Sequence, residues 1–181
     1  MRGVVVAVAL LCAAGCTGGP TAQPPPSSTT ATYPVPAEPV RPDEKPLSVP
    51  TTADGDTAFT LLGLTTGMET LIGSHAEWPA KGRFARVRMV VVNNGRSNVL
   101  FDARKHVLLD EANAEYQVDT QAMLIKRQPD KLELGAGVRL EYDVYYDLPK
   151  DAKPRAIRVF GGPTLTDLQD QSSTEIALGG S

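Results

Sequence analysis

Cysteine is almost missing from this chain of 181 residues, which contains only Cys12 and Cys16. Both lie close to the N-terminus, in a stretch that is typical of an export signal. Export and processing there would leave the mature chain without a free thiol for a disulfide, a metal site or a cysteine nucleophile. We therefore expect the folded part to be stabilised by packing alone.

An excess of basic charge and a long apolar run are also lacking. Lysine and arginine number 18 against 21 acidic residues, for a net charge of −3, so no nucleic-acid partner is expected. The most apolar stretch covers the thirteen residues 3–15, whereas a membrane-spanning helix needs about twenty. This stretch predicts a secretory signal and not an anchor helix.

The signal ends in a pattern of its own. Arg2 precedes the apolar residues 4–11, and the small residues 13–15 stand directly before Cys16. This arrangement resembles the lipobox of bacterial lipoproteins, which implies cleavage before Cys16 and acyl chains on its sulfur. We interpret residues 1–15 as a lipoprotein signal peptide, Cys16 as the site of lipid attachment, and the protein as extracytoplasmic and anchored to the cell membrane. The alternative is ordinary secretion after cleavage at a small-residue site.

The stretch that follows the signal is rich in proline. Ten of the fifteen prolines lie in residues 17–56, where few large apolar groups are present to offset the entropy of ordering. Residues 16–56 are therefore predicted to be the lipidated cysteine followed by a disordered spacer rich in Pro, Ser and Thr. A Pro-rich ligand for a peptide-binding partner and an O-glycosylated stalk are alternatives.

Short strands separated by turn signals follow from residue 57 onward. The clearest period of two occurs in residues 83–92 and 138–146, and no stretch of ten residues shows a helical period. The pattern predicts one all-β domain over residues 57–181, an immunoglobulin-like antiparallel β-sandwich of seven to nine strands. The predicted strands are 57–64, 68–72, 83–92, 98–101, 106–109, 115–119, 138–146, 155–160 and 175–178, and residues 73–82 and 128–137 are predicted to be loops.

The alternation also divides the two best strands into an inner and an outer face. The predicted core is Val87, Met89, Val91, Leu140, Tyr142, Val144, Ile157 and Val159. Arg86 and Arg88 lie on the outer face of one strand, and Glu141 and Asp143 on that of the other. We expect the strands to be antiparallel neighbours with the arginines set against the acids, forming a solvated structural face.

Three sequence blocks carry a resemblance to a known family. Residues 82–95 read G-x-F-x-x-V-x-x-x-V-x-N-x-G, residues 108–116 contain an L-x-D block followed by Tyr116, and residues 134–149 supply a closing block. The chain resembles domain-of-unknown-function family four-three-five-two, seen in secreted and lipid-anchored envelope proteins and antigens. The resemblance covers residues 57–162 and implies an immunoglobulin-like sandwich outside the cell, with no catalytic residues. Asn113 stands where the family has a turn glycine, and asparagine tolerates the left-handed conformation.

Few residues suggest chemistry. His75 and His106 are far apart in sequence and are expected to be solvent or loop residues, so neither a metal site nor a cofactor is predicted. Trp78 is predicted to plug the core, with an exposed anchor as the alternative. No nucleophile elbow, phosphate-binding loop or metalloprotease motif is present, and we expect no catalysis.

These observations favour an interaction module: a β-sandwich held at the membrane by its lipid, binding an envelope protein or polymer. The alternative is a small apolar ligand carrier, which would need a cavity between the sheets.

Overall fold

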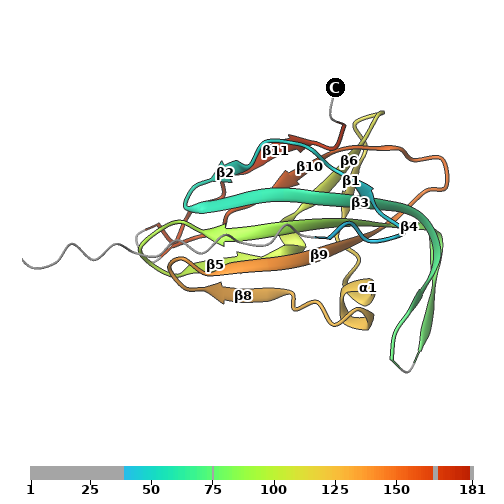
Figure 1. The fold of residues 1–181 in the computed structure, drawn as a ribbon, viewed down its shortest axis with the longest axis horizontal. Coiled ribbons are helices and arrows are strands. Elements are labelled where there is room, and N and C mark those ends of the chain that lie inside the picture. The colour runs from blue at the N-terminus through green and yellow to red at the C-terminus, as the bar shows by residue number, and fades with distance from the viewer. Residues whose placement is uncertain (1–38, 75, 165–166, 180–181) are drawn as a thin grey trace, which may run out of the picture. The chain divides into compact units, whose positions relative to one another are not determined.

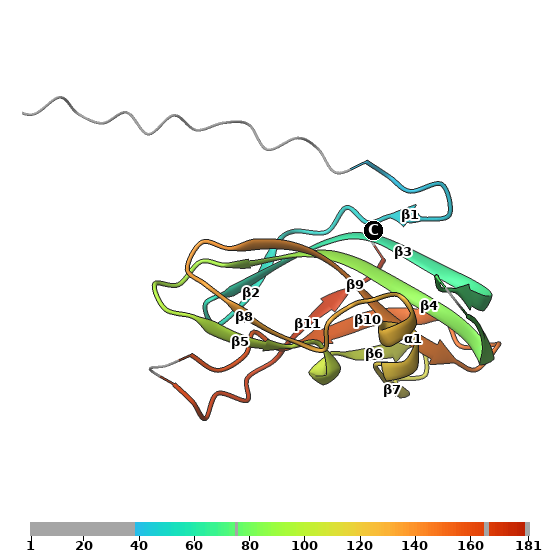
Figure 2. The same ribbon diagram turned by 90° about the horizontal axis from the view of Figure 1, so that it is seen from below.

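The computed structural model describes residues 39–74, 76–164 and 167–179. They form an antiparallel β-sandwich, as predicted (Figure 1). Figure 2 shows its two layers. The first sheet has the order β1-β3-β4-β9, with β2 also paired to β3; the strands are β1 (Lys45–Pro46), β2 (Thr52–Asp54), β3 (Thr57–Ile72), β4 (Glu77–Asn93) and β9 (Arg139–Leu148). The second sheet has the order β11-β10-β6-β7 and comprises β6 (Val107–Asp110), β7 (Glu115–Gln117), β10 (Pro154–Val159) and β11 (Thr174–Ala177). A separate two-stranded ribbon pairs β5 (Val99–Asp102) with β8 (Lys131–Leu134).

The core lies between the sheets and contains the side chains that the apolar–polar alternation of the strands predicts to be buried. Strands β4 and β9 are antiparallel neighbours, with Val87 opposite Val144 and Met89 opposite Tyr142. All the predicted core residues are buried except Leu140, which is partly buried and packs against the cluster. The predicted inner face is therefore confirmed.

The predicted boundary between spacer and domain is wrong for the residues that the structure describes. Residues 45–46 and 52–54 are strands that pair with β3, and Leu47 and Val49 pack against the core. Proline is tolerated here because β1 lies at a sheet edge, where the missing N–H of Pro46 leaves no ladder position empty. Residues 16–38 lie outside the described part of the chain.

The Asp54–Asp56 stretch ends the predicted spacer, yet Asp54 belongs to β2 and to the fold. The Asp54 side chain is buried and accepts a hydrogen bond from the backbone N–H of Gly161 at 2.7 Å. A Cβ at Gly161 would lie 2.1 Å from the Asp54 carbonyl oxygen, so only glycine lets the two segments approach this closely. The first sheet is thereby fastened to the chain that follows β10.

Two predicted loops contain strands instead. The predicted strands 57–64 and 68–72 form one strand, and the predicted loop 73–82 is largely the end of a long β3–β4 hairpin, which projects from the body of the domain (Figure 1). Trp78 lies on this extension with 39% of its surface exposed, so its assignment to the core is wrong. The predicted loop 128–137 contains β8.

Both helical elements of the described residues are shorter than ten residues, in agreement with the missing helical period. Helix α1 (Thr120–Ile125) begins at Asp119, whose side chain accepts a hydrogen bond from the Ala122 N–H at 2.8 Å, and a single 3₁₀ turn covers Ala103–Lys105. Asn113 has φ of 62°, as expected for an asparagine in a glycine position. Over the ranges that the structure describes, no helix is long and apolar enough to cross a membrane.

Candidate functional site

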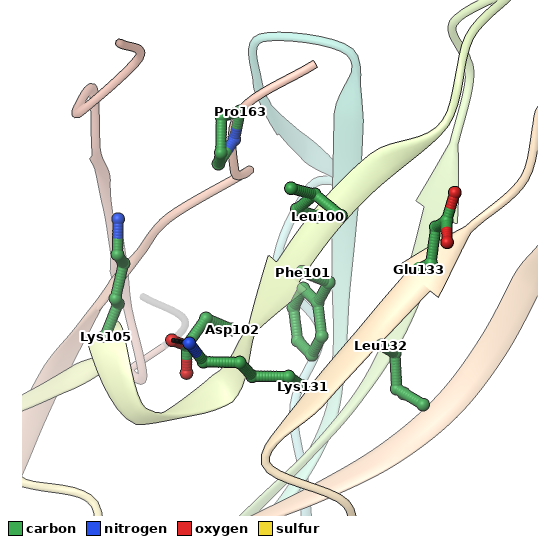
Figure 3. Close-up of a pocket in the computed structure, with 8 residues that line it drawn as sticks. All are labelled: Leu100, Phe101, Asp102, Lys105, Lys131, Leu132, Glu133 and Pro163. Carbon is green, nitrogen blue, oxygen red and sulfur yellow. Dashed lines mark ion pairs between the residues drawn. The ribbon is translucent and has the colours of Figure 1, made fainter. Parts of the chain in front are cut away.

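A hollow of about 300 Å³ opens over the β5–β8 ribbon (Figure 3). It is lined by Leu100, Phe101, Asp102, Lys105, Lys131, Leu132, Glu133 and Pro163. Four of these residues carry charge, two of each sign, and they surround apolar side chains. The hollow therefore offers an apolar contact inside a polar rim, which is the usual composition of a binding surface.

The register of the ribbon decides which side chains reach the hollow. Val99 and Phe101 point inward and are 0% and 1% exposed, so the residue between them faces out, and Leu100 is 48% exposed. Leu100 lies opposite Glu133, and Asp102 lies opposite Lys131. Alternation along β5 and β8 thus places one leucine and three charged side chains on the same outer surface.

The far wall comes from the loop after β10. The Leu100 backbone N–H donates to the Pro163 carbonyl oxygen at 2.9 Å. Gly162 has φ of 97°, and a Cβ there would lie 2.4 Å from the Leu100 carbonyl oxygen. Glycine is therefore required at 162 for Pro163 to stand beside Leu100.

Charges at the rim are arranged in pairs. Arg104 donates to Asp102 through Nε at 3.0 Å and Nη2 at 2.9 Å, and these hydrogen bonds lower the pKa of the Asp102 carboxyl. Lys131 Nζ lies 3.5 Å from Asp102 Oδ2, with its side chain 66% exposed. Lys105 Nζ donates to Gln171 Oε1 at 3.1 Å. Asp102 stays ionised to low pH, while both lysines retain hydrogen-bonding capacity toward a ligand.

His106 lies behind this surface, in the connection between the 3₁₀ turn and β6, as expected of a loop residue, but it is buried and not exposed to solvent. It is 0% exposed, with its ring centroid 5.7 Å from that of Phe59 and 5.2 Å from that of Phe101. Nδ1 accepts the Phe160 backbone N–H at 3.2 Å, and Nε2 has no partner among the described residues. Burial lowers the pKa of His106 to about 3, against a small opposing effect of Asp102. His106 is therefore a neutral core residue at physiological pH, without access to the hollow.

Metal ligands do not converge in the described part of the chain, where no group of three or more His, Cys, Asp or Glu could hold an ion. His75 and the predicted lipid-attachment residue Cys16 both lie outside the described residues. The lipid attachment remains a prediction.

The charged outer face of β4 and β9 is a second polar cluster, and the prediction for it is half right. Arg88 lies directly opposite Asp143, and its Nη1 is 3.0 Å from Glu141 Oε1, so arginine does face acid across the strands. The face is not solvated, however, because Arg88 is 2% exposed and Asp143 is 8% exposed. The segment that precedes β1 covers it, and Glu44 binds Arg88 through Oε1 at 2.7 Å and Oε2 at 2.9 Å.

That cover removes the β4–β9 face from the candidate binding surfaces. Arg41 adds bonds to Asp143 at 2.7 Å and Glu141 at 3.0 Å, and Arg86 Nη2 lies 3.4 Å from Asp43 Oδ1. These side chains therefore fasten the N-terminal segment to the sheet.

Comparison with known proteins agrees with this fold. Residues 50–168 match the model of a family described as Domain of unknown function (DUF4352). The chain belongs to this family. The resemblance read from the three sequence blocks is therefore confirmed as to family, and the family's description assigns no activity.

Solved structures support the same architecture. The yjhA protein of Bacillus subtilis is similar with a TM-score of 0.56 at 13% identity, over 72% of this chain and 97% of that one. A conserved hypothetical protein from Bacillus anthracis is similar with a TM-score of 0.51 at 15% identity, over 76% of this chain and 98% of that one. These likenesses extend to the fold alone. Among curated proteins, none matches the sequence.

Sequence reasoning missed the hollow because it missed β8. The stretch Lys131–Leu134 alternates polar and apolar side chains, which is a period of two over only four residues. The breakers around it, at 129–130 and 135–137, dominated the interpretation as a loop. Without β8, Leu100 had no partner strand and no defined face.

Proposed function

We propose that this protein is a lipid-anchored, extracytoplasmic binding module, in which acylated Cys16 holds the sandwich at the membrane and the sandwich binds an envelope partner. The support for the anchor is the sequence before Cys16. The described fold begins at residue 39, so the 22 residues 17–38 separate it from the lipid. Such a length spans at most about 80 Å, which confines the partner to the neighbourhood of the same membrane.

The observation that carries the binding role is the hollow over the β5–β8 ribbon, with exposed Leu100 beside its charged rim. Lys105 and Lys131 are balanced by Asp102 and Glu133. These four charged residues that line the hollow sum to zero, and a lining without net charge has no general attraction for a polyanion. It suits a polypeptide segment that presents an apolar side chain between charges of both signs, so a protein is favoured over an anionic polymer.

The hollow does not favour the apolar carrier. A carrier would enclose its ligand among inward-facing residues of both sheets, yet none of the predicted core residues lines this hollow. Its position on the outer side of a two-stranded ribbon is that of a contact surface.

Site-specific photo-crosslinking in intact cells tests the binding role. A photo-reactive residue replaces Leu100 in the full chain, and the matched control carries it at Glu111, which is also exposed but lies in the turn after β6. We expect a discrete adduct with a second protein from position 100 alone. Lys105→Glu should weaken that adduct, and Lys153→Glu, an equal charge change away from the hollow, should not.

Equal adducts from both positions, or none from position 100, would contradict the proposed binding surface. An adduct of this chain with itself alone would contradict a separate protein partner.

A further inference from the structure

Strand β8 leaves one edge of the ribbon unpaired, because β5 is its only strand partner among the residues described. The Leu100 N–H bonds to Pro163 on the side of β5 away from β8. In an antiparallel pair, hydrogen-bonded and non-hydrogen-bonded positions alternate. Glu133, opposite Leu100, therefore directs its backbone N–H and C=O out of the ribbon, and Lys131, two residues away, does the same.

The two residues whose backbone groups point out of the ribbon have charged side chains of opposite sign. Lys131 and Glu133 are exposed and lie on the outer surface of the ribbon. Natural sheets protect short edges with charge, and an edge with one sign of charge repels its own copy. An edge that carries one charge of each sign is instead complementary to itself when two copies run antiparallel.

The alternating direction of the backbone N–H and C=O groups along β8 limits the ways in which two copies of this edge can pair. Outward-facing residues must oppose outward-facing residues, so the twofold axis passes through position 131, 132 or 133. An axis at 131 sets lysine against lysine, and an axis at 133 sets glutamate against glutamate. An axis at Leu132 sets Lys131 of each copy against Glu133 of the other, twice, and like charges directly opposed are unfavourable while opposite charges are favourable.

We propose that β8 pairs antiparallel with β8 of a second copy of this chain, with the twofold axis at Leu132. The pair exchanges four backbone hydrogen bonds, two at each Lys131–Glu133 position. It joins two ribbons into one four-stranded sheet. Each Lys131 then lies between Asp102 of its own chain, already 3.5 Å away, and Glu133 of the second copy.

The position of the edge permits this approach. Strand β8 lies at the lower margin of the domain in Figure 1, and among the described residues no strand pairs with its side away from β5. Leu132, on the opposite surface from the charges, is partly buried against the core, and the two copies would bring this leucine against its equivalent at a closely spaced, non-hydrogen-bonded position. The interface is small, so association should be weak and dependent on concentration.

Single cysteines at the three possible axis positions test the register. The variants L132C, K131C and E133C are made in the full chain with C12A and C16A, so that the introduced thiol is the only one and no lipid anchor is involved. Only a residue on the axis meets its own equivalent within disulfide range. On oxidation at high protein concentration, we expect several-fold more disulfide-linked dimer from L132C than from K131C or E133C. Equal yields, no dimer, or a maximum at 131 or 133 would overturn the proposal.

Charge reversal tests the same pairing without a cysteine at the interface, which matters because L132C removes a partly buried leucine. K131E and E133K should each weaken self-association by about tenfold, since each replaces two attractions with two repulsions. Mixing the two variants should restore association as a heterodimer. The controls K153E and E111K make the same charge changes elsewhere and should associate as the parent does. Unchanged self-association of K131E, or no recovery on mixing, would overturn the proposal.

Discussion

Glu44→Gln should destabilise the folded domain strongly, although the sequence placed this residue in a disordered spacer. The Glu44 side chain is 0% exposed and the Arg88 side chain 3% exposed, and three hydrogen bonds of 2.7, 2.9 and 3.2 Å join them. Removing one partner of a buried ion pair costs about 3–5 kcal/mol, because the other charge stays buried. Glu141 still lies 3.0 Å from Arg88, so we expect the lower end, about 3 kcal/mol.

A loss of that size corresponds to a fall in melting temperature of roughly 10 °C for a domain of this length. Thermal unfolding followed by circular dichroism measures it on the full chain. Glu115→Gln is the matched control, since it removes the same charge from an exposed pair with Arg158, 2.8 Å long with side chains 49% and 29% exposed, and such pairs contribute at most about 1 kcal/mol. A melting temperature for Glu44→Gln within 2 °C of the parent, a margin well below the shift expected for a buried pair, would refute the assignment of residues 39–56 to the fold.

Three other changes follow from the same structure. Val144→Asp buries an unpaired charge at a position that is 0% exposed, so we expect loss of the folded state by circular dichroism. Gly63→Ala places a Cβ 2.1 Å from Glu44 Cδ; it should cost about 1–3 kcal/mol by urea unfolding, and much less in a Glu44→Ala background. Burial lowers the pKa of His106 in the folded state from 6.5 to about 3, so unfolding takes up a proton between these pH values. Stability should fall with decreasing pH there by up to about 1.4 kcal/mol per unit, and His106→Leu should remove that part of the slope.

The architecture could be predicted from sequence wherever one face of a strand is apolar and the other charged. Residues 83–92 and 138–146 show this pattern, and the pairing of β4 with β9 and the buried face followed from it. The family could be recognised because its sequence blocks define turns and strand positions. Asn113 adopted φ of 62° for the same reason, since a local turn depends on local chemistry.

Errors arose where tertiary contacts override composition. Proline-rich sequence predicts disorder, yet Glu44 is ordered by an arginine that is distant in sequence and lies on β4. The outer face of β4 and β9 looked solvated because the sequence does not reveal what covers it. His106 is polar and follows Arg104 and Lys105, but its ring packs against Phe59 and Phe101. No periodicity in the sequence predicts that burial.

The central claim, a binding module held by lipid at Cys16, is tested most directly by labelling cells with a fatty acid that can be detected on the protein. Cys16→Ala should abolish the label and release the chain from the membrane fraction. Cys12→Ala, which changes a cysteine within the predicted signal, should leave both unchanged. Label and membrane fractionation that persist in Cys16→Ala would contradict the account.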